Sequence, residues 1–205
     1  MTKKINNIHL FLNELFPEVG CELNYNKDYE LAIAVMLSAQ TTDASVNKVT
    51  PLLFSTFDTL EKLANANPLD IENIIHSLGL AHNKAKNIVS FAKKLLNEYS
   101  GKLPSDKNLL ATFPGIGNKS AGVIRAEVFK IPDLPVDTHI LRISHRLGLS
   151  TSSNPDKVEI DLKKIVPEEL WIKSHHQLIH FGRYFCTAKN PKCEMCKIKQ
   201  YCNKD

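Results

Sequence analysis

Residues 113–137 read Phe-Pro-Gly-Ile-Gly-Asn-Lys-Ser-Ala-Gly-Val-Ile-Arg-Ala-Glu-Val-Phe-Lys-Ile-Pro-Asp-Leu-Pro-Val-Asp, and this stretch decides the fold. Gly115 and Gly117 predict a tight turn, because glycine adopts backbone angles and allows close approaches that a Cβ forbids. The apolar residues after the turn predict a helix, and the unpaired amides at the start of such a helix suit a phosphate group. A short helix capped by Ser105-Asp106 is predicted before the turn, so the stretch forms a helix-hairpin-helix motif.

Two residues with reactive side chains flank the second helix of this motif. Lys119 follows Gly117 by two residues, where the helix dipole and partial burial both disfavour the charged form of its amine. An amine that is neutral more often can attack carbon. Asp137 comes 18 residues later, past a loop marked by Pro132 and Pro135, and its carboxylate can take up protons or stabilise a cation. The pair indicates a nucleophile and an acid–base group, although a solvated lysine after an ordinary turn gives the same pattern.

The composition is that of a globular protein with a mild positive charge. The chain has 205 residues, of which 43% are hydrophobic and 23% are charged, and its formal net charge is +4. This charge permits a polyanionic partner such as a nucleic acid. No apolar run approaches the roughly 20 residues of a membrane span, and the N-terminal segment is too interrupted for a secretory signal. The sequence therefore predicts a cytoplasmic protein with no membrane partner.

The rest of the chain shows helical periodicity and neither a strand pattern nor an internal repeat. Asp28 and Asp43 are expected to cap two of the helices, and Pro51 is expected to kink or interrupt the second of them. The predicted class is all-α. The helices that follow the caps at Asp28 and Asp43 carry apolar residues at 31–37 and 46–53, and further helices are predicted over residues 5–16, 59–66, 68–77, 84–99, 140–147, 155–165 and 167–184.

Four cysteines crowd the last twenty residues with the spacing Cys-x6-Cys-x2-Cys-x5-Cys: Cys186, Cys193, Cys196 and Cys202. Four thiolates can bind tetrahedral zinc or a cubane iron–sulfur cluster. Zinc ribbons usually contain two separate Cys-x2-Cys pairs, and this chain has one, so the spacing favours a [4Fe–4S] cluster while zinc stays the alternative. The same loop is basic, which favours contact with phosphate groups. Its lysines are Lys189, Lys192, Lys197 and Lys199.

Four stretches together resemble the endonuclease III family of bifunctional DNA glycosylases, in the helix-hairpin-helix-GPD superfamily. They are Leu-Ser-Ala-Gln-Thr-Thr-Asp-Ala-Ser-Val-Asn-Lys at 37–48, Gly-Leu-Ala-His-Asn-Lys-Ala-Lys-Asn-Ile at 79–88, the hairpin through Val-Asp-Thr-His-Ile at 113–140, and the cysteine loop. The resemblance implies a two-domain fold. Residues 21–132 would form a six-helix domain that contains the hairpin, and residues 1–20 with 133–205 a helical domain with a [4Fe–4S] cluster on the four cysteines.

The resemblance also implies an activity. The protein would remove oxidised pyrimidines from duplex DNA and then act as an abasic-site lyase, cutting the strand by β-elimination through a Schiff base on Lys119, with Asp137 as the second catalytic residue. It would act as a monomer on double-stranded DNA that contains damaged pyrimidines or abasic sites. The family positions that touch DNA correspond to Gln40 and Leu80, which enter the duplex, and to Gly115, Gly117, Lys189 and Lys192.

The sequence departs mildly from the family pattern next to these positions. Asn118 and Ser120 flank the lysine where arginine and threonine are common, and Ala81-His82 follows Leu80 in place of a more usual Tyr-Asn pair. These differences leave the substrate preference open.

Two functions from other classes remain as alternatives. The chain could be a DNA-binding module that grips phosphates without cleaving anything, or an iron–sulfur protein that senses redox conditions through its cluster. A reactive lysine and a carboxylate would have no purpose in either.

Overall fold

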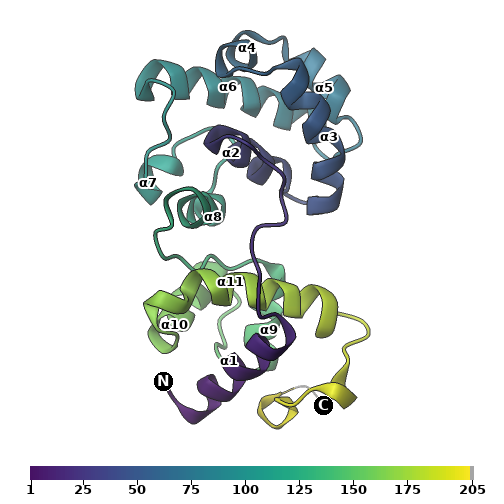
Figure 1. The fold of residues 1–205 in the computed structure, drawn as a ribbon, viewed down its shortest axis with the longest axis vertical. Helices are drawn as coiled ribbons and strands as arrows, with labels where there is room; N and C mark the ends of the chain where they lie inside the picture. Colours follow the sequence, from purple (N-terminus) through teal and green to yellow (C-terminus); the bar gives the residue numbers. More distant parts are fainter. Residues whose placement is uncertain (204–205) are drawn as a thin grey trace. The chain divides into compact units, whose positions relative to one another are not determined.

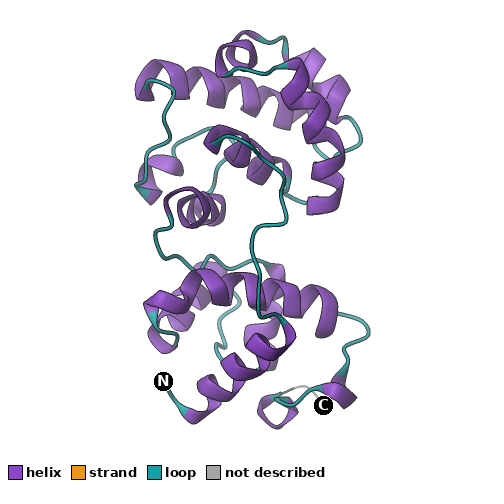
Figure 2. Ribbon diagram, in the orientation of Figure 1, coloured by secondary structure: helices purple, strands orange, loops and turns teal. Residues whose placement is uncertain are grey.

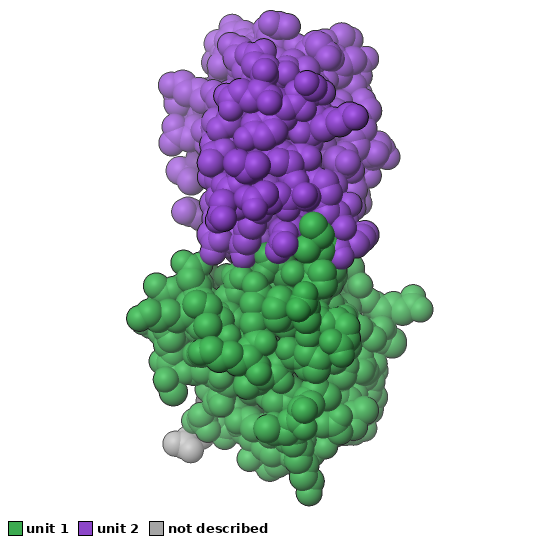
Figure 3. Space-filling model, turned by 90° about the vertical axis from the view of Figure 1, so that its left-hand side faces the viewer, with its two compact units in different colours: residues 1–21, 131–205 green, residues 22–130 purple. Residues whose placement is uncertain are grey.

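The computed structural model describes residues 1–203, and every regular element in that range is helical (Figure 2). The predicted all-α class is therefore confirmed. Contacts between Cα atoms divide the chain into two compact units (Figure 3). Unit 1 consists of residues 1–21 and 131–205, and unit 2 of residues 22–130. None of the helices within the described range is long and apolar enough to cross a membrane.

Unit 2 is built around a helix that is buried on all sides. Residues 31–37 of this helix, α2, are at most 3% exposed, and α2 packs against α3, α6 and α8. The long α6 packs its apolar stripe against α4 and α5 (Figure 1). The helices of unit 2 are α2 (Asp28–Leu37), α3 (Asp43–Thr56), α4 (Leu60–Asn65), α5 (Pro68–Ile75), α6 (Ala81–Tyr99), α7 (Lys107–Leu110) and α8 (Asn118–Phe129).

The third helix corrects two expectations about local sequence signals. α3 runs through Pro51, so of the kink or interruption expected there, the interruption is wrong. Proline removes one backbone hydrogen bond, and the burial of Val46, Val49 and Leu53 against the unit outweighs that loss. The helix also begins one residue earlier than expected, because the side chain of Thr42 accepts the cap hydrogen bond from the amide of Ser45.

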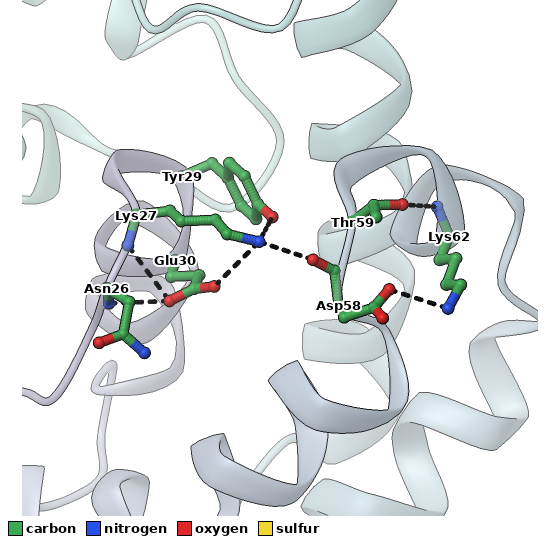
Figure 4. A network of polar contacts seen from close by, with 7 residues as sticks. All are labelled: Asn26, Lys27, Tyr29, Glu30, Asp58, Thr59 and Lys62. Carbon is green, nitrogen blue, oxygen red and sulfur yellow. Dashed lines mark hydrogen bonds and ion pairs between the residues drawn. The ribbon is translucent and has the colours of Figure 1, made fainter.

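A polar network fixes the start of α2 to the turn between α3 and α4 (Figure 4). The ammonium group of Lys27 donates to the carbonyl oxygen of Asp58 at 2.6 Å and to the hydroxyl of Tyr29 at 3.0 Å. The buried carboxylate of Glu30 accepts from the backbone amide of Lys27 at 3.2 Å. Asp58 forms an exposed ion pair with Lys62 at 2.9 Å. Because α2 is anchored at its start, the loop at its other end has a rigid base.

Unit 1 packs its helices around aromatic side chains. Phe11 contacts Phe181 and Phe185 edge-on, with ring centroids 6.3 and 5.6 Å apart, and Ile198 from the cysteine loop is 1% exposed in the same core. The cysteine loop is therefore anchored in the core of its unit. The elements are α1 (Lys3–Leu15), α9 (Thr138–Arg146), α10 (Pro155–Ile165), η1 (Glu168–Leu170), α11 (Trp171–His180), η2 (Phe181–Phe185), η3 (Cys193–Met195) and η4 (Lys199–Tyr201).

A buried charge cluster holds the loop that leads to Asp137. Lys163 on α10 contacts the carboxylates of Asp133, which is fully buried, and of Glu159. Burial alone would lower the pKa of Lys163, but the hydrogen bonds to these two carboxylates outweigh it and raise the pKa above its ordinary value of 10.5. Nδ1 of His175 lies 2.9 Å from the carbonyl oxygen of Pro135 and donates to it. The loop is thus fixed by partners on α10 and α11.

We expect Lys163→Met to destabilise the protein by about 3–5 kcal/mol, because it leaves two buried carboxylates without their cation. Urea unfolding at pH 7 measures the loss. Since the folded-state pKa is raised, the stabilisation by Lys163 is fully present below pH 10.5 and is lost as the pH rises through the folded-state pKa. The difference between wild type and variant should therefore shrink only in strongly alkaline buffer.

Lys164→Met is the matched control for this prediction. Lys164 is the next residue on α10, and it forms an exposed ion pair with Asp161 at 3.4 Å. Its replacement should leave the unfolding midpoint almost unchanged. Equal effects of the two variants would contradict the role given to the buried cluster.

Candidate active site

The two glycines of the hairpin turn serve different purposes. Gly115 has φ +80°, and a Cβ at this position would lie 2.7 Å from Sδ of Met36, so only glycine fits. Gly117 has an ordinary extended backbone, and a Cβ there would meet no atom within 4 Å. Gly115 is therefore required by the fold, whereas Gly117 leaves open space in front of α8.

The N-terminus of α8 has no side-chain cap. Its N-cap residue is Gly117, which has no side chain that could accept from the first amides of the helix. In contrast, side-chain oxygens of the N-cap residues accept from the first turns of α1, α3, α4, α5, α7, α9 and α10. The first amides of a helix carry partial positive charge. This end of α8 can therefore bind an anion such as a phosphate.

Lys119 is the second residue of α8 and lies in its first turn. The residue is half-buried, and its side chain makes neither a hydrogen bond nor an ion pair with any of residues 1–203. No carboxylate among these residues therefore forms an ion pair with its amine. The amine is available to an electrophile that approaches this end of the helix.

Asp137 is the N-cap residue of α9. Its Oδ1 accepts a hydrogen bond from the amide of Ile140 at 2.8 Å, and the residue is half-buried. Burial lowers the pKa of His139, while the negative charge of Asp137 acts in the opposite direction. One carboxylate oxygen is thus committed to the helix cap, which fixes the orientation of the other.

Gln40 and Leu80 occupy strained and exposed positions. Their φ angles are +55° and +62°, in the left-handed region that only glycine adopts at little cost. Leu80 is 54% exposed although it is a large apolar side chain. Strain of this kind persists where the surrounding structure enforces it, and it clusters at functional sites. Beside Leu80, Nδ1 of His82 lies 2.8 Å from the carboxylate of Glu72 on α5, which ties the start of α6 to α5.

The cysteine loop is held by an arginine from α9. The guanidinium of Arg146 donates to Sγ of Cys186 at 3.2 Å and to the carbonyl oxygens of Thr187 at 2.8 Å and Ala188 at 3.1 Å. At the other end of the loop, the amide of Asn203 donates to the carbonyl oxygen of Arg146 at 2.6 Å. One residue therefore closes the loop from both ends.

The loop cysteines suit a cluster better than a single ion. All four line one cavity together with Phe181 and Phe185, and they form no disulfide. Burial and then the neighbouring thiols raise the pKa of Cys196. The loop has a single Cys-x2-Cys pair, where a zinc ribbon usually has two, so four thiolates around one cavity favour a cubane cluster.

The four lysines of this loop separate into two pairs. Lys197 contacts Glu14, and Lys199 lies 4.0 Å from Glu194. Lys189 and Lys192 are exposed and have no carboxylate partner among the residues that the structure describes. Only the second pair therefore has its full charge available for a polyanion.

Sequence reasoning missed several residues that support these positions. The buried Lys84 lies four residues before Ile88 and seven before Phe91, on the apolar stripe of α6. This spacing was the signal that could have identified it. Arg146 and Lys163 carried no such signal, because their partners come from distant segments of the chain.

Comparison with known proteins agrees with this geometry. Residues 33–168 match the family described as HhH-GPD superfamily base excision DNA repair protein, and residues 186–202 match the iron-sulfur binding domain of endonuclease III. The endonuclease III of Rickettsia felis is 41% identical over 198 residues, which cover 97% of this chain and 93% of that protein. That of Bacillus subtilis is 40% identical over 192 residues, which cover 93% and 88%.

A solved structure of a trapped endonuclease III–DNA covalent intermediate matches with a TM-score of 0.93 at 39% identity, covering 99% of this chain and 97% of that one. A helix-hairpin-helix fold with an iron–sulfur loop defines a DNA glycosylase of base excision repair. This chain belongs to the endonuclease III family of that superfamily. It is a bifunctional DNA glycosylase and abasic-site lyase with a [4Fe–4S] cluster. The alternatives of a binding module, a redox sensor and a zinc site therefore do not apply.

We expect Gly117→Asp to weaken binding to damaged and undamaged duplex DNA alike, because phosphate contacts carry no sequence information. The free protein has room for the side chain, and aspartate is a favourable N-cap residue, so the melting temperature should stay the same or rise. Fluorescence anisotropy and thermal melting measure the two quantities.

Gly115→Ala should show the opposite pattern. The new Cβ collides with Met36 and the backbone is left-handed, so the melting temperature should fall.

For the Gly117→Asp variant, a loss of discrimination between damaged and undamaged DNA without a general loss of affinity would contradict the phosphate contact.

Proposed function

We propose that this enzyme excises oxidised pyrimidines from double-stranded DNA, with Lys119 as the nucleophile and Asp137 as the acid–base group. The observation that carries the proposal is the unpaired amine of Lys119 in the first turn of a helix without a side-chain cap. The matched endonuclease III was trapped as a covalent intermediate with DNA, which supports a nucleophile on the protein.

The reaction begins when the damaged base leaves the stack, since its sugar carbon is otherwise out of reach. Gln40 and Leu80 enter the duplex and occupy the vacated space. The lone pair of the Lys119 amine forms a bond to C1′, and the glycosidic bond breaks with its electrons going to the base, which takes up a proton. The amine then loses a proton, and its lone pair forms the C=N bond while the C1′–O4′ bond breaks and O4′ takes up a proton, so the sugar ring opens. The resulting protonated imine acidifies the C2′ hydrogens. Loss of one of them breaks the C3′–O bond, which cuts the strand by β-elimination.

Asp137 handles protons during these steps and stabilises the positive charge that develops on the sugar. The hydrogen bond from the amide of Ile140 engages Oδ1, which leaves Oδ2 for proton transfer. The cluster of Lys163, Asp133 and Glu159 holds the loop before Asp137 in place. It therefore helps to position the Asp137 side chain.

The DNA backbone is bound by two kinds of groups. The hairpin amides at Gly115 and Gly117 accept a phosphate at the start of α8, and Lys189 and Lys192 supply charge from the cysteine loop. The [4Fe–4S] cluster supplies covalent cross-links that order this loop. Its ligands are Cys186, Cys193, Cys196 and Cys202.

The remaining assignments concern the organisation and the surroundings of the enzyme. We assign the hairpin domain to residues 21–132 and the cluster domain to residues 1–20 with 133–205. The enzyme works as a monomer in the cytoplasm. Asn118 and Ser120 adjust the phosphate contact, and Ala81 and His82 adjust the preference among oxidised pyrimidines.

We expect Lys119→Gln to abolish both base release and the adduct that borohydride traps, because an amide cannot form an imine. Binding to abasic-site DNA should remain measurable, since the hairpin amides are unchanged. The assay uses duplexes that contain thymine glycol, an abasic site or uracil, with denaturing gels for cleavage and for the covalent adduct. Wild-type levels of adduct in the variant would disprove the assignment of the nucleophile.

We expect Asp137→Asn to lower base excision by at least about 10²-fold, the effect of losing a positioned acid–base group. An asparagine Oδ1 can still accept from the amide of Ile140, so α9 keeps its cap and the protein its stability. Single-turnover kinetics measure the excision rate, and anisotropy should show lesion binding at least as tight as that of wild type. An unchanged rate would mean that Asp137 acts only as a helix cap.

A further inference from the structure

A buried lysine with no counter-charge connects the start of α6, just after Leu80, with the loop that contains Gln40. Lys84 is 4% exposed, and its ammonium group donates to the hydroxyl of Thr41 at 2.9 Å. It makes no ion pair with any of residues 1–203. Burial lowers the pKa of Lys84 below its ordinary value, and no neighbouring charge acts against that effect.

This position is unfavourable for a cation in two ways. A buried charge without a partner of opposite sign costs several kcal/mol of folding free energy. Lys84 also lies near the start of α6, at the positive end of the helix dipole. Methionine has nearly the same length and would fill the space between the apolar neighbours at no such cost. Stability therefore does not explain a lysine here.

The hydrogen bonds of Lys84 connect two segments that carry strained residues. Its backbone amide donates to the carbonyl oxygen of Leu80 at 3.0 Å, and its side chain reaches Thr41. The hydroxyl of Thr41 in turn donates to the carbonyl oxygen of Ala39 at 3.4 Å. These two residues flank Gln40, whose φ is +55°. The amide bond to Leu80 is the ordinary first-turn bond of α6, which any residue at position 84 would make. The lysine side chain is what links the start of α6, four residues after Leu80, to the backbone on both sides of Gln40.

We propose that Lys84 is a positioning residue that holds the loops of Gln40 and Leu80 in the conformation that enters the duplex. The inference rests on the proposed role of these two residues as the groups that fill the space of the flipped base. Lys84 contributes most when a base must be extruded. It contributes little at an abasic site, where there is no base to unstack.

The test compares Lys84→Met with Thr41→Val and with the double variant. Each single variant should reduce single-turnover excision of thymine glycol by about tenfold, because misplaced inserting groups raise the barrier. The double variant should lose no more than either one, since both remove the same contact. Cleavage at a preformed abasic site should stay within about twofold of wild type. A 2-aminopurine beside the lesion should show a smaller rise in fluorescence on binding, because the stack opens less.

Stability distinguishes positioning from a general structural role. Lys84→Met should melt at the same or a higher temperature than wild type, because it removes a buried charge. Thr41→Val should melt lower, since it leaves the cation without its acceptor, and adding Lys84→Met should restore stability without restoring excision. Lys86→Met on the exposed face of α6 is the matched control and should excise at the wild-type rate. Parallel losses of stability, excision and abasic-site cleavage would overturn the proposal.

Excision by the variants Gln40→Ala and Leu80→Ala separates a failure of the inserting role of these residues from a failure of the positioning role of Lys84. If both excise normally, neither residue fills the duplex, and the inference about Lys84 falls with that role. If both lose excision while Lys84→Met retains it, the role of Gln40 and Leu80 stands and the positioning role of Lys84 is overturned.

Discussion

The close contact between the backbone of Gly115 and the side chain of Met36 determines where the chemistry of unit 2 can take place. Because a Cβ at position 115 would lie 2.7 Å from the Met36 sulfur, the turn can come this close to α2 only with a glycine at that position. This contact places the start of α8 against a helix that is buried on all sides and anchored at its beginning by Lys27. The uncapped amides and the amine of Lys119 therefore take their position from α2. The loop with Gln40 leaves the other end of the same helix, so a single rigid element orients both parts of the site.

Unit 1 positions its functional segments with polar contacts, because those segments contain little apolar sequence. The loop before Asp137 is tied by the buried contact of Lys163 with Asp133 and by His175. The cysteine loop is tied by Arg146, which donates to four acceptors in that loop. Backbone carbonyls in irregular segments must find donors when they are taken from water. An arginine, with its five donors in a fixed plane, can satisfy several of them at once.

The sequence predicted the features that depend on local chemistry and missed those that depend on distant partners. The cap at Asp106 and the end of α6 at Ser100-Gly101 follow from short-range rules and were predicted. The continuation of α3 through Pro51 was not predicted, because it depends on the burial of apolar residues on both sides of the proline. In the same way, residue types and spacing predicted the candidates Lys119, Asp137 and the four cysteines. The sequence could not separate Lys189 and Lys192 from Lys197, whose partner Glu14 lies 183 residues away. It also could not tell the buried Lys84 from a solvated lysine.

Several segments of the candidate site in unit 2 carry a cost in folding free energy. Gln40 and Leu80 each hold a left-handed backbone at about 1–3 kcal/mol, and α8 lacks a cap worth about 1 kcal/mol. Lys84 adds the cost of an unpaired buried cation. The net stability of a typical domain is only about 5–15 kcal/mol, so these costs are large on that scale. They persist because the core around α2 and α6 enforces the geometry. Ser100 and Lys130 also have left-handed backbone, but each of them ends a helix, where this conformation is common. Leu80 instead begins α6, so its backbone strain has no such explanation.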